Sequence, residues 1–374
     1  MPVPDPVIAS FDLALVGFGR VGRRFATLLS ERRDQLAQDY HLAYRVVGIA
    51  TGRHGTAMHR DGLDLTRAVE IIEAGGNLGL MHDDGAGSAP TDTYSFIERL
   101  TDISDHGPRV VVETTTLDVT TGEPAVGHVR AAIAAGAHVV TANKGPAAFA
   151  YHALRGAADA ADVRFLTEGA VLDGIPVLNL VRETLPTVMI KGFRGVINST
   201  TNYMLTAMEQ GGSAADALAA MQVQGVAEAD ASLDVKGWDA AAKTAVLVNV
   251  LMDGRTTLHA IARTGISGLT GEIVRNAVRR GRRIKLVASA SRSGDTISGA
   301  VAPVELDADD PLARLDGQAN ALVLVTDLLG EIVITHRHGG LTQTAFALLA
   351  DLITIRRAVP ETALHQNPSR PCHQ

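Results

Sequence analysis

The sequence predicts an α/β protein whose N-terminal part forms a doubly wound parallel sheet of the Rossmann type. Short apolar segments that fit strands alternate with segments of helical spacing through residue 150. The first apolar segment runs directly into a glycine-rich turn, and a longer region of mixed composition follows the alternating part. With 374 residues, 46% of them hydrophobic, the chain is long enough for two or three domains with a sizeable core.

Composition and charge exclude several classes of protein. No apolar run reaches the ~18 residues that a membrane-spanning helix needs, and the N-terminus lacks the pattern of a signal peptide. The net charge of −7, without a long basic run, argues against nucleic acid as a partner. The single cysteine, Cys372, excludes an internal disulfide and indicates a reducing compartment. We therefore expect a cytoplasmic globular protein that binds neither a membrane nor nucleic acid.

The first strand is expected in residues 11–17, FDLALVG, and it ends at a glycine motif. Gly17, Gly19 and Gly22 form G-x-G-x-x-G, and the residues after the motif have helical spacing. In such motifs one glycine makes the tight turn, one lets the backbone approach a pyrophosphate, and one lets helix pack on strand. Because the helix N-terminus also offers free N–H groups, we expect a dinucleotide site here. Its expected residues are Gly17, Phe18, Gly19, Arg20, Val21 and Gly22.

The second strand, in residues 44–55, bears on the type of dinucleotide. Proteins that bind NAD usually end this strand with an acidic residue that holds the ribose hydroxyl groups. This sequence has Arg53 there and no acid. A guanidinium suits a 2′-phosphate because it can pair with phosphate through two hydrogen bonds. The alternative is a solvated loop arginine, so the pattern favours NADP and leaves NAD possible.

Two more strands are expected in this part of the chain. Residues 108–118, PRVVVETTTLD, form an apolar strand that ends in small hydroxyl-bearing residues. Residues 127–149 contain a helix, a stop at Gly136 and a further strand. Since alternating strands and helices predict a parallel sheet, we expect a nucleotide-binding domain in residues 1–150, with its core in residues 10–150.

Lys144 follows the last of these strands, in the segment Asn143-Lys144-Gly145-Pro146. Ligands of such sheets bind at the carboxyl ends of the strands, so Lys144 is expected at the same edge as the glycine turn. A solvated loop lysine is the alternative, but a position beside the nicotinamide favours a role in the chemistry. Thr115 and Asn143 are expected to contact the cofactor at this edge.

An acidic segment, GVAEADASLDVKGWDAAAK, occupies residues 225–243. Residues 238–252 have the pattern of a long apolar helix, on which Asp239 and Lys243 lie four residues apart and share a face. An ordinary surface ion pair is the alternative, but the three alanines between the two residues favour a cleft. The acids of the segment are Glu228, Asp230, Asp234 and Asp239.

A second polar segment opens a helix in residues 195–212, GVINSTTNYMLTAMEQGG. The start of this helix carries Asn198, Ser199 and Thr200 directly after a short strand. Another helix is expected in residues 213–225. Its expected cap is Ser213 and its expected stop is Gly225.

These segments resemble the motifs of the homoserine dehydrogenase family. The family pattern G-Y-A-E-x-D-P-x-x-D-V-x-G-x-D-x-x-x-K is similar to residues 225–243, and N-G-T-T-N-Y-I-L is similar to residues 198–205. The resemblance covers roughly residues 11–355 in the family's order. The other matches are T-A-N-K-x-P with residues 141–146, E-x-x-V-x-x-G-I-P with residues 168–176, and the closing helix with residues 343–352.

The resemblance implies an NAD(P)-dependent oxidoreductase that interconverts L-homoserine and L-aspartate 4-semialdehyde. Lys243 and Lys144 would be catalytic and would carry the proton of the substrate hydroxyl, with Lys243 as the main donor and acceptor. Two lysines close together would lower each other's pKa from ~10, while Asp239 would oppose that shift and orient them. Glu228 and Asp234 would take the ammonium of the amino acid. The implied substrate-binding residues are Glu228, Asp234, Asp239, Asn198, Ser199 and Thr200, and the implied further cofactor contacts are Gly225 and Gly340.

The resemblance also implies a monovalent cation such as sodium near the domain junction, held by Glu168, Val171 and Asp173. It implies a homodimer or higher homo-oligomer that assembles through a mixed α/β substrate domain. We expect a monofunctional chain without an aspartokinase segment or a regulatory domain. The expected divisions are the substrate domain in residues 151–319, a return segment in residues 320–357 that completes the nucleotide-binding domain, and a tail in residues 358–374.

Several positions depart from the family pattern. Ser199 replaces a glycine where the substrate carboxylate is expected, and Val226 replaces a tyrosine. These changes leave open a paralogue that acts on a related amino-acid aldehyde or alcohol. A non-catalytic nucleotide-binding sensor is a further alternative, although the retained lysines and acids argue against it. The other departures are Ala231 for a proline, Leu172 and Asp173 for small residues, and His336, Arg337 and His338 in place of a glycine-rich turn beside the cofactor.

Overall fold

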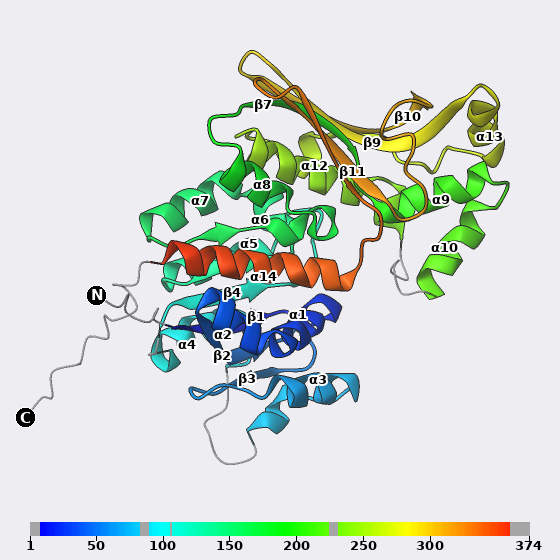
Figure 1. Cartoon of the computed structure of the whole chain (residues 1–374). Helices are drawn as coiled ribbons and strands as arrows, with labels where there is room; N and C mark the ends of the chain where they lie inside the picture. Colours follow the sequence, from blue (N-terminus) through cyan, green and yellow to red (C-terminus); the bar gives the residue numbers. More distant parts are fainter. Residues whose placement is uncertain (1–7, 83–89, 105–106, 224–230, 360–374) are drawn as a thin grey trace, which may run out of the picture.

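The computed structural model describes residues 8–82, 90–104, 107–223 and 231–359, which form two six-stranded sheets with helices packed around them (Figure 1). The first sheet has the strand order β3-β2-β1-β4-β5-β6, and every neighbouring pair is parallel except β2 and β3. This is the doubly wound sheet that the sequence predicts. Its strands are β1 (Ala9–Val16), β2 (Leu42–Ala50), β3 (Thr56–Met58), β4 (Arg109–Glu113), β5 (His138–Thr141) and β6 (Phe165–Leu166).

The helices of this part cover the sheet with apolar faces. Helix α1 buries Phe25 and Leu29, four residues apart, and α14 packs against it with Leu348 and Leu352. Side chains of Asp64 and Asp92 cap the starts of α3 and α4. The helices are α1 (Arg20–Glu31), α2 (Arg33–Tyr40), α3 (Leu65–Glu73), η1 (Leu78–Met81), α4 (Thr93–Ile103), α5 (Ala125–Ala134), α6 (Lys144–Phe149), α7 (Tyr151–Ala160) and α14 (Leu341–Ala358).

The second sheet has the strand order β12-β11-β7-β9-β10-β8 and is antiparallel except between β10 and β8. Helix α12 packs against β9 and β10, and its buried residues include Ala241, Ala245 and Val248. The strands are β7 (Ile190–Val196), β8 (Ala262–Arg263), β9 (Arg282–Ser293), β10 (Thr296–Asp307), β11 (Asn320–Thr326) and β12 (Glu331–His336). The helices are η2 (Glu168–Ala170), η3 (Leu172–Gly174), α8 (Val177–Thr184), α9 (Ser199–Glu209), α10 (Ala214–Val223), α11 (Ser232–Val235), α12 (Trp238–Leu251), η4 (Leu258–Ala260) and α13 (Gly271–Arg279).

Two expected domain boundaries are wrong. Residues 320–336 do not complete the first sheet, because β11 pairs with β7 and β12 pairs with β11 in the second sheet. Only α14 returns to the nucleotide-binding part, where it lies across the sheet beside α1 (Figure 1). The first domain also extends beyond residue 150, because β6 pairs with β5.

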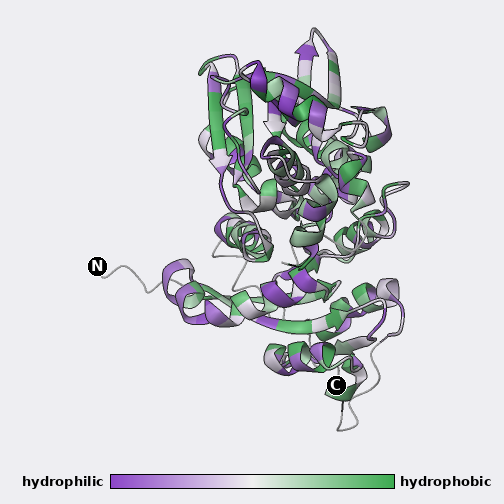
Figure 2. Ribbon diagram, turned by 90° about the vertical axis from the view of Figure 1, so that its right-hand side faces the viewer, coloured by the Kyte–Doolittle hydropathy of each residue, from purple (hydrophilic) through white to green (hydrophobic). Residues whose placement is uncertain are grey.

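Hydrophobic residues occur in strands and helices of both domains, as the hydropathy colouring of Figure 2 shows. The buried strand β1 illustrates the cause, since Phe11, Leu13 and Leu15 face one side of the sheet and Ala14 and Val16 face the other, and both sides are covered. Among the described residues, no helix combines the length and the apolar character that crossing a membrane requires.

Candidate active site

A cavity of about 780 Å³ lies between the glycine turn, the carboxyl ends of β4 and β5, and the starts of α9 and α12. Its volume is in the range of small-molecule and cofactor sites. The cavity brings together residues from loops and helix starts of both domains, including the start of α14. The predicted site residues that line it are Gly19, Arg20, Val21, Thr115, Asn143, Lys144, Val171, Asn198, Ser199, Thr200, Asp234, Asp239, Lys243 and Gly340.

Other predicted site residues lie elsewhere. Phe18 is buried in the core of the first domain, and Arg53 is exposed and is not among the lining residues. Glu168 is buried behind the cavity wall. Glu228 and Gly225 lie outside the described residues, as does the side chain of Asp173.

The glycine turn has the geometry of a pyrophosphate cradle. Gly17 has a φ of +90°, and a Cβ there would lie 2.7 Å from the carbonyl carbon of Thr114. A Cβ on Gly22 would lie 2.7 Å from the carbonyl oxygen of Gly17, so this position lets α1 pack against the turn. Gly19, just before α1, has no atom within 4 Å of its Cβ position. The residues therefore fit a dinucleotide whose phosphates approach the open side of Gly19 and the N-terminus of α1.

A buried carboxylate organises the adjacent strand ends, and the sequence prediction did not include it. Glu113, at the end of β4, accepts a hydrogen bond from the backbone N–H of Thr115 at 3.0 Å and another from Thr141 Oγ1 at 2.9 Å. Thr141 in turn accepts a bond from the backbone N–H of Asn143, whose side chain caps α6. An acid directly after the three valines of this strand was the only sign of it in the sequence.

Lys144 and Lys243 contact the same carboxylate. Lys144 Nζ lies 3.2 Å from Asp239 Oδ1, and Lys243 Nζ lies 3.0 Å from Asp239 Oδ2. Lys243 is buried, with 7% of its surface exposed, and its Nζ also donates to the carbonyl oxygen of Ile197 at 2.9 Å. Because Lys144 starts α6 and Asp239 lies in the first turn of α12, this cluster joins the two domains at the cavity wall.

Asn198 connects the two aspartates of the cluster. Its Nδ2 donates to Asp234 Oδ1 at 2.7 Å and to Asp239 Oδ2 at 3.0 Å, while its Oδ1 caps α9 through the backbone N–H of Thr201. Burial alone would raise the pKa of Asp239, but the ammonium groups of Lys243 and Lys144 hold it well below its usual range. Burial, and then the charge of Asp239, raise the pKa of Asp234. An added cation near Asp234 would relieve this repulsion.

The residues that depart from the family pattern differ in whether they line the cavity. Ser199 lines the cavity, and its hydroxyl accepts a hydrogen bond from Asn320 Nδ2 at 2.9 Å. Gly339 and Gly340 line the cavity, whereas His336, Arg337 and His338 are not among the lining residues. The three residues that replace the family's glycine-rich turn are therefore not part of the cavity wall. Asn320 was not foreseen, because its partner is 121 residues away.

Glu168 and Asp351 form a buried acidic pair beside the cavity. The Glu168 carboxylate accepts backbone N–H groups of Leu178 at 2.9 Å and Asn179 at 2.6 Å, at the start of α8. Asp351, on α14, accepts the backbone N–H of Glu168 at 2.9 Å. Burial, and then the charge of Asp351, raise the pKa of Glu168 to about 8, and burial raises that of Asp351 to about 6. Within the described part of the chain, no group of three or more His, Cys, Asp or Glu side chains could hold a metal ion.

The first domain combines a doubly wound sheet with a glycine cradle, and Lys144 and Lys243 share the carboxylate of Asp239 in the cavity wall. Together these features define a nucleotide-dependent dehydrogenase. Comparisons with known proteins identify the family. The family model described as homoserine dehydrogenase matches residues 176–353, and the model described as homoserine dehydrogenase, NAD binding domain, matches residues 17–168. The chain belongs to the homoserine dehydrogenase family, whose members are NAD(P)-dependent oxidoreductases that act on a CH–OH group.

Individual relatives cover nearly the whole chain. The NAD(+)-dependent homoserine dehydrogenase of Pseudomonas canavaninivorans is 35% identical over 96% of this chain and 99% of its own. The homoserine dehydrogenase of Methanocaldococcus jannaschii is 36% identical over 92% of this chain and 98% of its own. Among solved structures, a putative homoserine dehydrogenase from Archaeoglobus fulgidus is similar with a TM-score of 0.78 and 30% identity, covering 92% of this chain and 99% of that one. A hyperthermophilic archaeal homoserine dehydrogenase in complex with NADPH is similar with a TM-score of 0.76 and 26% identity, over 94% of this chain and 99% of that one.

Proposed function

We propose that this chain interconverts L-homoserine and L-aspartate 4-semialdehyde, with Lys243 and Lys144 as its proton-carrying residues. The observation that carries the proposal is the pair of contacts that both ammonium groups make with Asp239, at 3.0 and 3.2 Å, in the wall of the cavity. The test is a nicotinamide absorbance assay of the purified protein with homoserine, aspartate semialdehyde and analogues that differ by one carbon. Activity confined to an analogue would identify a paralogue, and inactivity with all of them would favour a sensor.

The amino acid would be held by groups of opposite sign. Asp234, with Glu228, would take its ammonium, and the raised pKa of Asp234 supports this because a bound cation would offset the nearby charge of Asp239. The start of α9, with Ser199 and Thr200, would take its carboxylate, since a helix N-terminus offers unpaired N–H groups and a partial positive charge. Because the ammonium and the carboxylate share the α-carbon, holding both would let the reacting hydroxyl, at the far end of the side chain, extend away from them.

The nucleotide supplies hydride chemistry when it is bound between the glycine turn and the edge formed by Thr115 and Asn143. The chain's own task is then to move the hydroxyl proton. Lys243 Nζ is buried, fixed by Ile197 and Asp239, and an ammonium N–H there would protonate the oxygen during reduction. In oxidation the neutral amine would accept that proton. Lys144 Nζ would share the transfer or stabilise negative charge on the oxygen, because it reaches the same carboxylate from the nucleotide side.

We further propose that NADP binds more tightly than NAD. Arg53 follows the end of β2, is exposed, and has no acidic residue beside it in the segment Thr51–His54. Arginine at this place suits a 2′-phosphate. The Pseudomonas canavaninivorans relative is named as NAD(+)-dependent and an archaeal structural neighbour is described with NADPH, so both preferences occur among similar proteins.

A monovalent cation at Glu168, Val171 and Asp173 and a homo-oligomer are the remaining proposals. The cation is supported by the buried Glu168 carboxyl, whose pKa of about 8 reflects burial and a neighbouring acid, both of which a cation would offset. Assembly through the second domain is supported by β12, a sheet edge with the exposed apolar side chain of Val333. Light scattering during size-exclusion chromatography measures the oligomeric state.

A further inference from the structure

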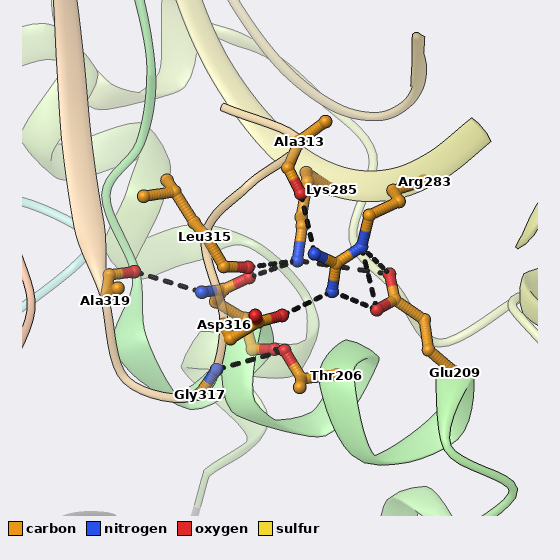
Figure 3. Close-up of polar contacts among 10 residues, drawn as sticks. Thr206, Glu209, Arg283, Lys285, Ala313, Leu315, Asp316, Gly317 and Ala319 are labelled. Carbon is orange, nitrogen blue, oxygen red and sulfur yellow. Dashed lines mark hydrogen bonds and ion pairs between the residues drawn. The ribbon is translucent and has the colours of Figure 1, made fainter. Parts of the chain in front are cut away.

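Lys285 lies on β9 with its side chain fully buried, at 0% exposure, inside the second domain (Figure 3). Its Nζ donates to Asn202 Oδ1 at 2.9 Å and to the carbonyl oxygen of Leu315 at 2.6 Å. Burying an ammonium costs free energy unless its donors are satisfied, and such a charge often adds little net stability. A lysine that meets this cost in a wholly buried position is a candidate for a role beyond stability.

We propose that Lys285 is a positioning residue for the amino-acid substrate, which holds the start of α9 and the adjoining residues 315–320 in the arrangement that fixes Ser199. The inference rests on the proposed function, in which the start of α9 takes the substrate carboxylate. Lys285 itself does not reach the cavity, because it is not among the lining residues. It acts through two groups, Asn202 and Leu315.

The first group is Asn202, in the first turn of α9. While its Oδ1 accepts from Lys285, its Nδ2 donates to the carbonyl oxygen of Ala319 at 3.0 Å. Lys285 therefore orients the Asn202 amide, since an amide turned the other way would set its NH₂ group against the ammonium. This orientation ties α9 to Ala319, the residue directly before Asn320.

The second group is Leu315, which begins the segment of residues 315–320. Lys285 donates to the first residue of this segment, at the Leu315 carbonyl (Figure 3). Asn202 donates to the carbonyl oxygen of Ala319, the residue before Asn320. Asn320 Nδ2 then donates to Ser199 Oγ at 2.9 Å, and Ser199 lines the cavity beside Thr200. Ser199 starts α9, and Asn320 ends the segment that begins at Leu315. The Lys285 ammonium is hydrogen-bonded to both of these elements, so it links the two partners of the Ser199–Asn320 contact.

Arg283, two residues from Lys285 on the same strand, provides a matched comparison. It binds Glu209 with Nε at 3.1 and 3.0 Å from the two carboxylate oxygens, and it also binds Asp316 and the carbonyl oxygen of Ala313 (Figure 3). Burial lowers the pKa of Lys285 to about 8, against the opposing charge of Glu209, whose carboxylate lies 4.0 Å away. Arg283 thus binds Ala313 and Asp316, but among the hydrogen bonds of the described residues it contacts neither Asn202 nor Ala319, the residue next to Asn320.

The experiment compares Lys285→Gln, Arg283→Gln and Asn320→Ala in the full chain. The wild type is first assayed with homoserine and its analogues, and the amino-acid alcohol that it accepts becomes the probe for the variants. We expect Lys285→Gln and Asn320→Ala to raise the KM for this alcohol ~10-fold, with the nucleotide KM within about twofold of wild type, as the loss of substrate positioning predicts. Arg283→Gln should lower the melting temperature with the alcohol KM within about twofold of wild type. The alcohol KM of the double variant Lys285→Gln/Asn320→Ala should be no higher than that of the more impaired single variant, because the two residues act on one contact.

An unchanged alcohol KM in folded Lys285→Gln would overturn the inference, and so would an equal rise in Arg283→Gln, which would reveal general loosening of the domain. If Lys285→Gln does not fold, the test rests on Asn320→Ala, which removes the hydrogen bond from Asn320 to Ser199. An unchanged alcohol KM in that variant would overturn the inference as well. A wild type that is inactive with every amino-acid alcohol would instead overturn the proposed function, which keeps the two failures distinct.

Discussion

Lys144 Nζ, at the start of α6, lies 3.2 Å from Asp239 Oδ1, in the first turn of α12. The two residues belong to different domains, and α6 packs against α12. Their ion pair therefore places a group from the nucleotide side and a group from the substrate side at one point of the cavity wall. A reaction that joins a nucleotide and an amino acid requires such a meeting point, because the reacting groups must be held in fixed relative positions.

Removal of Lys243 should abolish most of the activity. Lys243→Met keeps length and apolar bulk but removes the proton and the charge at a buried position. General acid–base groups typically contribute ~100- to 10,000-fold, so we expect kcat to fall by at least ~100-fold with little change in nucleotide affinity. Lys144→Met should also lower kcat severely. The kcat of the double variant should be only slightly below that of the less active single variant, because the effects of residues that act as a unit are not additive.

The control for these variants is Lys191→Met, on β7, because Lys191 is an exposed lysine of the second sheet. Its kcat should stay within about twofold of wild type, as for a surface substitution far from the site. Steady-state kinetics and thermal unfolding of the wild type and the four variants separate catalytic loss from unfolding. A folded Lys243→Met that keeps more than about a tenth of wild-type kcat would show that this lysine is structural.

Replacement of Arg53 tests the cofactor preference. Arg53→Ala should weaken NADP binding by roughly 1–3 kcal/mol, the value of a charge-assisted contact, and leave NAD binding nearly unchanged. Fluorescence titration with the two reduced nucleotides measures both affinities. Arg60→Ala serves as a control, since Arg60 is also an exposed arginine in the loop after β3. Equal losses for NADP and NAD would mean that Arg53 does not contact the 2′-phosphate.

Replacement of Asp234 tests the ammonium site. Asp234→Asn removes the charge but keeps the size of the side chain, and Glu228→Gln does the same for its expected partner. Both variants should raise the KM for homoserine by at least ~10-fold and leave the KM for the nucleotide within about twofold, because the proposed contact of the lost charge is with the ammonium of the amino acid and not with the nucleotide. Asp216→Asn, at an exposed position of α10, is the control. An unchanged homoserine KM in the folded variants would refute the assignment.

The sequence predicts those parts of the site that depend on residues close together in the chain. The glycine turn needs only a strand, three glycines and a helix in sequence, and the structure confirms this order at Gly17 and Gly22. The pairing of Asp239 with Lys243 follows from their spacing of four residues on α12, and the structure contains it at 3.0 Å. Here the backbone periodicity alone brings the side chains together.

The parts that sequence reasoning missed depend on partners far apart in the chain. Lys285 and Asn202 are separated by 83 residues, Asn320 and Ser199 by 121, and Asp351 and Glu168 by 183. The same cause explains the error about β11, because a continuous apolar run such as residues 321–325 is typical of a strand but does not say which sheet the strand joins. Its pairing with β7 is decided by tertiary packing, which the local pattern of residues 320–326 does not contain.

The last prediction concerns the buried acids Glu168 and Asp351 and the dependence of stability on pH. Their pKa values are raised to about 8 and about 6 in the folded protein, from 4.5 and 3.8, chiefly by burial. The folded state therefore holds protons that the unfolded state releases. The stability that these protons contribute is fully present below the unfolded pKa values and is lost as the pH rises through the folded values. These two groups should accordingly lower the melting temperature as the pH rises from about 4 to about 8, whereas His138, whose pKa burial lowers from 6.5 to about 4, acts in the opposite direction in the acidic part of this range.

Glu168→Gln, which keeps the shape of the side chain without a titrating proton, should flatten this decline in a series of thermal unfolding scans at fixed ionic strength. Glu70→Gln, at an exposed position of α3, should leave the decline as it is in the wild type. If a monovalent cation binds at Glu168, sodium chloride should reduce the decline relative to tetramethylammonium chloride, because a bound cation favours the ionised carboxyl and lowers its pKa. An equally steep decline in Glu168→Gln would place the responsible protons on other groups. Identical curves in the two salts would leave the buried acids without a cation, so that their protons alone would offset the cost of burying them.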